Sequence, residues 1–176
     1  MSEEKEAALQ QPGTETHSGQ FTLQKIYVKD ISFETPHSPQ IFQKEWKPSV
    51  NLDISNSAKA ISEEHYEVIL AVTVTVSFED TNVYLIEIHQ AGIFHIAGFP
   101  EDIAARMLGT MCPNILFPFA REMVSDMVTR GGFPQLLLAP INFEALYLQQ
   151  MQKEAENEKI DVCVNNYIIQ CCRLSG

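Results

Sequence analysis

The sequence predicts an α+β fold: a four-stranded antiparallel sheet with helices packed on one face. Two observations support this prediction. Strand signals occupy residues 21–97, whereas apolar residues recur at helical spacing from residue 101 onwards. Strands that come first and helices that follow them are typical of this fold class. The 176 residues match one ordinary domain, and a hydrophobic share of 45% suffices for a globular core.

The strand signals fall in four segments. Residues 21–33 are rich in aromatic and β-branched side chains, but their imperfect alternation indicates a bulge or a strand exposed on both faces. Residues 50–54 alternate over a shorter stretch. Residues 66–78 form the clearest strand, because every second residue is apolar and points the same way. The short turn FEDTN leads into residues 83–97, so these two strands are expected to form an antiparallel hairpin.

Two helices are expected next. Residues 101–111 carry apolar side chains at helical spacing, and residues 115–128 repeat apolar pairs every four positions. Pro118 is expected in the first turn of the second helix, because a proline deeper in a helix costs about 3 kcal/mol. Gly131 and Gly132 are expected to end this helix.

A last helix is predicted to begin after Asn142, which is a favourable N-cap residue. Its expected buried residues are Phe143, Leu146, Tyr147 and Met151.

The predicted fold leaves more apolar surface than one small domain can bury. Leu85 and Ile93 lie on the strand face opposite Ile86 and Ile88. A loop-like segment adds Ile41, Phe42 and Trp46. Excess apolar surface of this kind indicates self-association or a binding groove.

Charge and composition exclude several function classes. The net charge of −11 argues against nucleic-acid binding, which needs clustered Lys and Arg. Residues 1–20 are polar and acidic and predict a disordered leader rather than a secretion signal. No apolar run in the sequence approaches the roughly 20 residues needed to span a bilayer. A cytoplasmic protein without direct membrane insertion is therefore expected, with its folded body at 21–153 and a flexible tail at 154–176.

No pattern in the sequence points to catalysis, a metal or a cofactor. The glycines match neither the phosphate-binding loop nor the dinucleotide fingerprint. His89 and His95 share one predicted strand face beside Glu87, but a zinc site needs a third ligand, so surface histidines are the favoured interpretation. Cys112 is interpreted as a buried structural thiol.

Three further cysteines lie in the tail, at Cys163, Cys171 and Cys172. Their spacing matches no zinc site, which favours incidental thiols over a soft-metal site.

Three carboxylates on predicted strands suggest a binding surface. Asp30, Glu34 and Glu87 would form an acidic patch beside Leu85 if the first and fourth strands shared an exposed face. Such a patch would steer a basic partner. Spacing alone favours the simpler interpretation, in which these are solvated carboxylates.

Five blocks of sequence, in order, resemble the SecB family of bacterial export chaperones. They are KIYVKDISFETP (25–36), IFQKEWKP (41–48), QAGIFHIAG (90–98), CPNILFPFARE (112–122) and RGGFPQLLLAPINFEALY (130–147). The resemblance implies a SecB-like sheet assembled as a homotetramer, a dimer of dimers. It also implies a chaperone that needs no ATP, binds unfolded precursor polypeptides and delivers them to the translocase ATPase SecA.

The resemblance also implies roles for individual residues. The SecA-binding positions fall on Asp30, Glu34, Leu85 and Glu87. The positions tied to oligomer assembly fall on Ile86, Ile88 and Gln90. The client-binding positions fall on Phe42, Trp46, Leu146 and Tyr147.

The tail departs from the family, because the acidic start EAENEKID is followed by the apolar, cysteine-rich VCVNNYIIQCCRLSG. Two other functions stay open at this point. One is a SecB-like chaperone dedicated to an antitoxin or another specific client. The other is a small-molecule enzyme on this fold, for which no constellation of residues is present.

Overall fold

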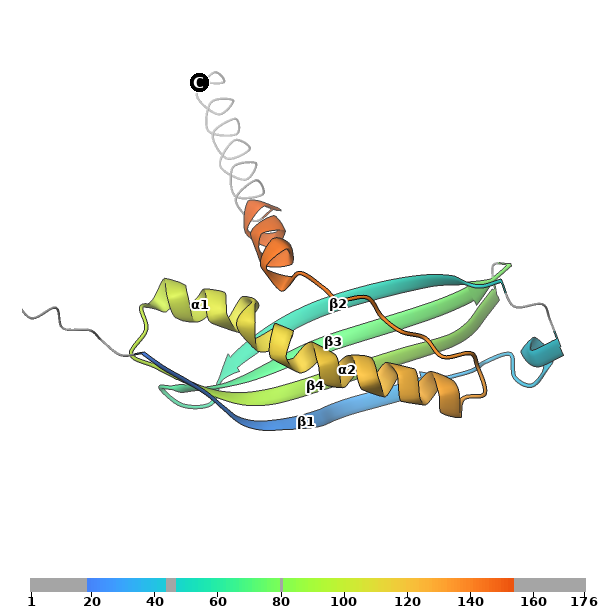
Figure 1. Ribbon diagram of the computed structural model, residues 1–176, viewed down its shortest axis with the longest axis horizontal. Coiled ribbons are helices and arrows are strands. Elements are labelled where there is room, and N and C mark those ends of the chain that lie inside the picture. The colour runs from blue at the N-terminus through green and yellow to red at the C-terminus, as the bar shows by residue number, and fades with distance from the viewer. Residues whose placement is uncertain (1–18, 44–46, 80, 154–176) are drawn as a thin grey trace, which may run out of the picture.

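The protein is described by a computed structural model that covers residues 19–43, 47–79 and 81–153. Four antiparallel strands form one sheet in the order β1-β4-β3-β2 (Figure 1). The strands are β1 (Gln20–Glu34), β2 (Ser49–Ala60), β3 (His65–Phe78) and β4 (Thr81–Ala97). The predicted four-stranded antiparallel sheet is therefore confirmed.

The hairpin of β3 and β4 forms the centre of the sheet. Phe78 pairs with Thr81 across the tight turn, as the short FEDTN connection predicted. On β3 every second residue from Val68 to Val76 is fully buried, and on β4 Ile86 and Ile88 are fully buried beside them. These side chains project from one face, which we call the helix face; the opposite side is the open face.

Strand β1 contains two bulges, which explain its imperfect alternation. The register with β4 shifts between Leu23 and Lys25 and again between Val28 and Asp30. Each shift inserts one extra residue, Gln24 or Lys29, so the apolar and polar positions change parity twice along one strand.

Strand β2 is longer than its sequence pattern indicates. It pairs with β3 from Ser49 to Ala60, although only residues 50–54 alternate clearly. Val50 and Leu52 are 48% and 36% exposed. Because β2 is an edge strand whose side chains are mostly exposed, it is held in the sheet mainly by its backbone pairing with β3.

Two helices cover the helix face of the sheet (Figure 1). Helix α1 spans Glu101–Gly109 and helix α2 spans Met111–Arg130. The buried side of α2 packs on β3 and β4. It consists of Cys112, Pro113, Leu116, Phe117, Ala120, Val124 and Val128.

The prediction that Pro118 would lie in the first turn of the second helix is wrong. Helix α2 begins at Met111, so Pro118 lies in its interior. Burial of apolar residues on both sides of this position, such as Leu116 and Val124, offsets the missing backbone hydrogen bond. The predicted end is confirmed, because the Gly131 N–H donates to the Met127 carbonyl and Gly132 adopts a positive φ of 83°.

A last helix over 143–153 begins where Asn142 caps it. The Asn142 side-chain oxygen accepts a hydrogen bond of 3.0 Å from the Ala145 N–H, as predicted. The expectation of four buried residues is only partly right. Phe143 is buried, but Leu146 and Met151 are 43% and 49% exposed.

One stretch of the described residues, Glu101–Arg130, is long and apolar enough by length and composition to cross a membrane, with a mean hydropathy of 1.2. The sequence predicted no stretch of this kind. The core helix of a soluble protein meets the same criterion, and α2 has a core side that packs on the sheet. The predicted leader (1–20, except its last two residues) and tail (154–176) lie outside the described residues.

Candidate functional site

The acidic patch predicted on the sheet lies on one face of two neighbouring strands. Glu34 pairs with Leu85, and Asp30 pairs with His89, two residues beyond Glu87. Residues paired across an antiparallel ladder point to the same side, so Asp30, Glu34, Leu85 and Glu87 share the open face. The condition that the sequence analysis set, a common face for the first and fourth strands, is therefore met. We call these four residues the acidic patch.

A polar bridge crosses β4 next to the acidic patch. Glu67 on β3 accepts a hydrogen bond from the Tyr27 hydroxyl, and both of its oxygens lie 2.8 Å from Lys29 Nζ. Tyr27 and Lys29 belong to β1, which does not pair with β3. The side chains of Glu67, Tyr27 and Lys29, which we call the cross-sheet bridge, therefore connect two non-adjacent strands.

The electrostatics of the cross-sheet bridge follow from these contacts. Hydrogen bonds from Lys29 and then from Tyr27 lower the pKa of Glu67. The same bond to Glu67, with burial, raises the pKa of Tyr27 to about 12, so the hydroxyl stays protonated and donates. None of these three residues was among the site residues predicted from the sequence. The parity break at Lys29 was the available signal, because a bulge re-aims one side chain.

Two histidines on β4 each contact a carboxylate on the open face. His89 Nε2 lies 3.1 Å from Glu87 Oε1, and His95 Nε2 lies 3.1 Å from Glu64 Oε2. His95 also packs against His65, with ring centroids 4.9 Å apart. Among the residues that the structure describes, no three His, Cys, Asp or Glu side chains are arranged so that they could hold a metal ion.

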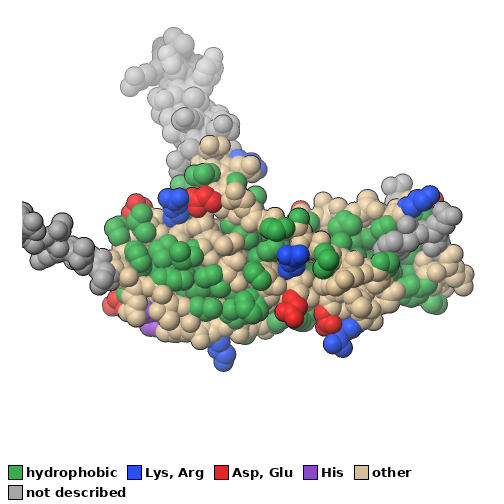
Figure 2. All heavy atoms as spheres, in the orientation of Figure 1, with side chains coloured by type: hydrophobic (Ala, Val, Ile, Leu, Met, Phe, Trp, Pro, Cys, Tyr) green, Lys and Arg blue, Asp and Glu red, His purple; other side chains and the backbone are tan. Residues whose placement is uncertain are grey.

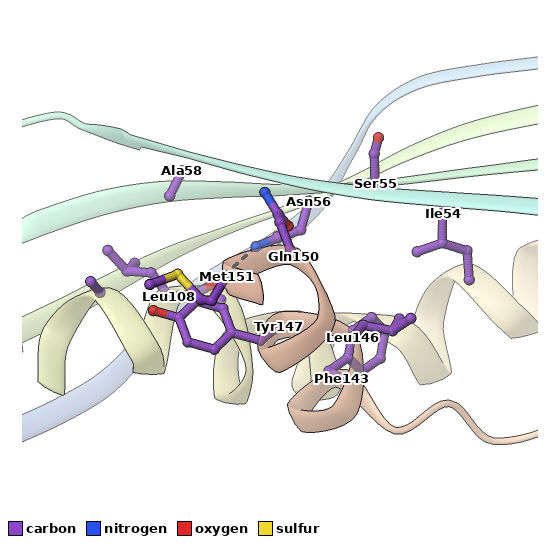
Figure 3. Close-up of a pocket in the computed structure, with 12 residues that line it drawn as sticks. Ile54, Ser55, Asn56, Ala58, Leu108, Phe143, Leu146, Tyr147, Gln150 and Met151 are labelled. Carbon is purple, nitrogen blue, oxygen red and sulfur yellow. Dashed lines mark hydrogen bonds between the residues drawn. The ribbon is translucent and has the colours of Figure 1, made fainter. Parts of the chain in front are cut away.

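On the other side of the molecule, a pocket of about 480 Å³ lies between β2, α1 and the 143–153 helix (Figure 3). We call it the apolar pocket. None of its lining side chains is charged. They are Ile54, Ser55, Asn56, Ala58, Ala105, Leu108, Gly109, Phe143, Leu146, Tyr147, Gln150 and Met151. Leu146 and Tyr147, two predicted client-binding residues, therefore line one pocket.

The apolar pocket is held open by contacts at its rim. Asn56 Nδ2 donates to the Leu108 carbonyl at 3.0 Å, which ties β2 to the end of α1. The Arg106 guanidinium donates to the Glu144 carboxylate, which ties α1 to the 143–153 helix. Gly109 allows the Tyr147 ring to approach, because a Cβ at residue 109 would lie 2.5 Å from that ring.

The third predicted client-binding residue, Phe42, lies elsewhere. It lies within the short 3-10 helix η1 (Gln40–Gln43), is 51% exposed and contacts Phe133 with ring centroids 5.0 Å apart. Phe133 in turn contacts Tyr84 on β4. Phe42 does not line the apolar pocket. The fourth predicted residue, Trp46, lies outside the described residues.

The three predicted assembly residues are buried within the single chain. Ile86 and Ile88 have no exposed area and Gln90 is 1% exposed, all on the helix face. The Gln90 side chain donates 2.9 Å to the Tyr27 carbonyl, beside the second bulge of β1. In the single chain these residues therefore pack against neighbouring elements and do not face outwards.

The outer surface of the two helices is rich in apolar side chains. Ile103, Met111 and Phe119 are 39%, 44% and 43% exposed. Figure 2 shows hydrophobic side chains gathered over α1 and α2. An apolar excess was predicted from other residues, and of these Phe42 is 51% exposed, whereas Ile41 is buried at 4%.

Cys112 is buried on the sheet-facing side of α2, as expected, and its burial raises the pKa of the thiol to about 12. The thiolate needed for nucleophilic chemistry is therefore strongly disfavoured.

Comparison with known proteins decides the family. The family model of SecB, the preprotein translocase subunit, matches residues 14–154. The chain belongs to the SecB family. SecB is an export chaperone, and the sequence-based resemblance is confirmed together with this function.

Two SecB proteins are similar to this chain over most of its length. The protein-export protein SecB of Nitrosococcus oceani is 56% identical over 146 residues, which cover 82% of this chain and 89% of that protein. SecB of Methylococcus capsulatus is 56% identical over 133 residues, which cover 76% and 86%.

Among solved structures, the chain is similar to the SecB-like chaperone of Mycobacterium tuberculosis in complex with a ChAD peptide from the HigA1 antitoxin. The TM-score is 0.58 at 17% identity, over 69% of this chain and 90% of that one. This likeness supports the SecB-like fold.

Proposed function

We propose that this chain binds unfolded precursor polypeptides in the cytoplasm without ATP, keeps them competent for translocation and delivers them to SecA. The apolar pocket carries the first part of this proposal. An unfolded chain exposes apolar side chains, and their burial yields about 25 cal/mol per Å² of apolar surface. A pocket without charged lining accepts many such side chains, and flexible Met151 at its rim adapts to their shapes.

The client-binding surface includes Leu146, Tyr147, Phe42 and Trp46 in this proposal. Leu146 and Phe42 expose 43% and 51% of their area, so both are available to a client chain. Because Phe42 lies outside the apolar pocket, a long client would contact at least two separate places. Several weak contacts along one chain raise the overall affinity by avidity.

The acidic patch is the proposed docking surface for SecA. Asp30 and Glu34 are exposed on the open face, and the side chain of Glu87 is 46% exposed. The patch and the apolar pocket occupy different faces, which allows SecA to dock while a client is held.

Self-assembly into a homotetramer, a dimer of dimers, is the third part of the proposal. The exposed apolar side chains of α1 and α2 support it, because burial between copies would remove them from water. Ile86, Ile88 and Gln90 would support assembly indirectly, by holding α2 in position. Native mass spectrometry of the purified protein, with and without an unfolded precursor, reports the number of subunits and bound clients.

Client binding is tested by the aggregation of a chemically denatured protein diluted without ATP. Wild-type protein should suppress the aggregation, and Leu146→Asp, which places a carboxylate at the rim of the apolar pocket, should weaken suppression several-fold. Gln149→Asp provides a matched control, because Gln149 is an exposed residue of the same helix that does not line the pocket. No suppression by the wild type would refute the holdase function.

SecA docking is tested separately with Glu87→Lys. This charge reversal should weaken SecA binding while aggregation suppression stays at the wild-type level. Equal loss of both activities would contradict the division between the two surfaces.

The antitoxin-dedicated alternative is not favoured. Relatives at 56% identity are protein-export proteins, whereas the antitoxin-bound chaperone is only 17% identical.

A further inference from the structure

One titratable side chain lies among the residues of the acidic patch and has no part in the proposed function. His89 is on the open face of β4, two residues after Glu87, and its Nε2 atom lies 3.1 Å from Glu87 Oε1. Across the ladder it pairs with Asp30 of β1. The side chains of His89 and Glu87 are 33% and 46% exposed, so both face solvent and any docked partner.

The charged groups that face His89 from the neighbouring strands are carboxylates. On β1 these are Asp30 and, further along, Glu34; on β4 it is Glu87. The nearest cation on β1 is Lys29, which belongs to the cross-sheet bridge. Its Nζ atom lies 2.8 Å from both oxygens of Glu67, which also accepts a hydrogen bond from Tyr27.

On the other flank of β4, strand β3 presents uncharged residues. Ala71 pairs with His89, and Thr73 pairs with Glu87. Asp53 of β2 pairs with Thr73 and lies one strand further away. Helices α1 and α2 lie on the helix face, on the other side of the sheet. His89 is therefore flanked by two carboxylates, with no cation turned towards it among the residues described around it.

We propose that His89 belongs to the docking surface and sets its charge, so that a basic partner binds tightly when the ring is neutral and weakly when it is protonated. This inference rests on the proposed docking of SecA at the acidic patch. Three carboxylates give the patch a charge of −3, and one imidazolium reduces it to −2. Histidine is the side chain that ordinarily changes charge between about pH 5 and 8.

The size of the effect follows from one added charge. At an effective dielectric constant of about 40–80, a unit charge roughly 6 Å from a cation of the partner changes the affinity by about three- to tenfold. The effect is largest at low salt, because exposed charges are screened over about 10 Å at 0.1 M ionic strength.

The test compares SecA binding at pH 6 and pH 8, at low ionic strength, for wild type, His89→Gln and His95→Gln. His95→Gln is a matched control, because His95 lies on the same strand and face, at the same 3.1 Å from a carboxylate, but outside the acidic patch. Wild type and His95→Gln should bind SecA about three- to tenfold more weakly at pH 6 than at pH 8. His89→Gln should lose most of this difference.

A second variant mimics the protonated ring. His89→Arg carries a permanent positive charge, so at pH 8 it should bind SecA as weakly as the wild type does at pH 6. Circular dichroism and native mass spectrometry confirm that each variant keeps its fold and assembly.

The outcomes separate the two proposals. An equal pH dependence in wild type and His89→Gln, or wild-type affinity of His89→Arg at pH 8, would overturn the role of His89 and leave the docking surface intact. Wild-type protein that binds no SecA at either pH would overturn the docking surface, and with it this inference.

Discussion

The cross-sheet bridge makes a sharp prediction about stability. The change is Glu67→Gln, which keeps the shape of the side chain and removes its charge. Glu67 accepts hydrogen bonds from Tyr27 and Lys29, and its side chain is only 16% exposed. Because it connects β1 with β3, the bond network spans three strands.

The magnitude follows from the two partners. Hydrogen bonds to charged groups contribute about 1.5–3 kcal/mol each, but the Lys29 side chain is 42% exposed and its share is screened by water. Glutamine still accepts one neutral hydrogen bond, so the free energy of unfolding should fall by about 1–2 kcal/mol. For a chain of this length, that lowers the thermal midpoint by about 2–8 °C.

The pH dependence of the loss is also fixed. Lys29 and Tyr27 lower the pKa of Glu67 in the folded protein. A lowered carboxylate pKa stabilises the fold in full above the unfolded value, and the stabilisation is lost as the pH falls through the folded value. The difference between wild type and Glu67→Gln should therefore be constant near neutral pH. It should shrink once the pH falls below the ordinary value of 4.5.

The assay is thermal unfolding by circular dichroism at matched protein concentration, from pH 4 to pH 8. Glu64→Gln is the control, because Glu64 also pairs with a side chain on the open face but is 55% exposed, and its loss should cost less than about 0.5 kcal/mol. Identical midpoints for wild type and Glu67→Gln at pH 7 would refute the bridging role. So would a difference that grows as the pH falls.

Three further predictions concern the helix face. Pro118→Ala should raise the free energy of unfolding by about 1–3 kcal/mol, measured by chemical denaturation, because Pro118 is exposed and its replacement restores a helix donor; a lower free energy of unfolding would show that the ring makes a stabilising contact outside the single chain. Gly109→Ala should displace the Tyr147 ring and weaken suppression of aggregation several-fold while circular dichroism stays unchanged, and unchanged suppression would count against the apolar pocket. Native Cys112 should resist iodoacetamide at pH 8 and become labelled in denaturant, as read by peptide mass spectrometry; rapid native labelling would contradict its burial and its pKa of about 12.

Much of the sheet could be predicted from the sequence, because period-two alternation reports directly which side of a strand is buried. The alternation of residues 66–78 identified β3 to within one residue, and the break within 21–33 correctly indicated a bulge. The common face of Asp30 and Glu87 depended on a strand order that alternation does not encode. The common face follows from the pairing of β1 with β4 in the sheet.

Two features could not be predicted, because distant residues determine them. The second half of β2, from Ser55 to Ala60, has polar and small side chains and is a strand because its backbone pairs with β3. The apolar pocket is built from β2, α1 and the 143–153 helix, which are far apart in the sequence and share no periodic signal. Local rules also failed at Pro118, where burial along the whole of α2 outweighs one missing donor.

The two bulges of β1 have a consequence for how this strand tolerates length changes. Phe33 and Glu34 are consecutive, and they point to opposite sides of a single layer of backbone. If β1 slid by one residue along β4, the Glu34 side chain would point into the core and the Phe33 side chain would point into solvent. Gln24 and Lys29 fix the alignment against such sliding, because each extra residue is held across the sheet, to His65 and to Glu67. Deleting Gln24 or Lys29 would therefore move the apolar side chains to the open face and the polar side chains to the helix face, as far as the next bulge or the end of the strand.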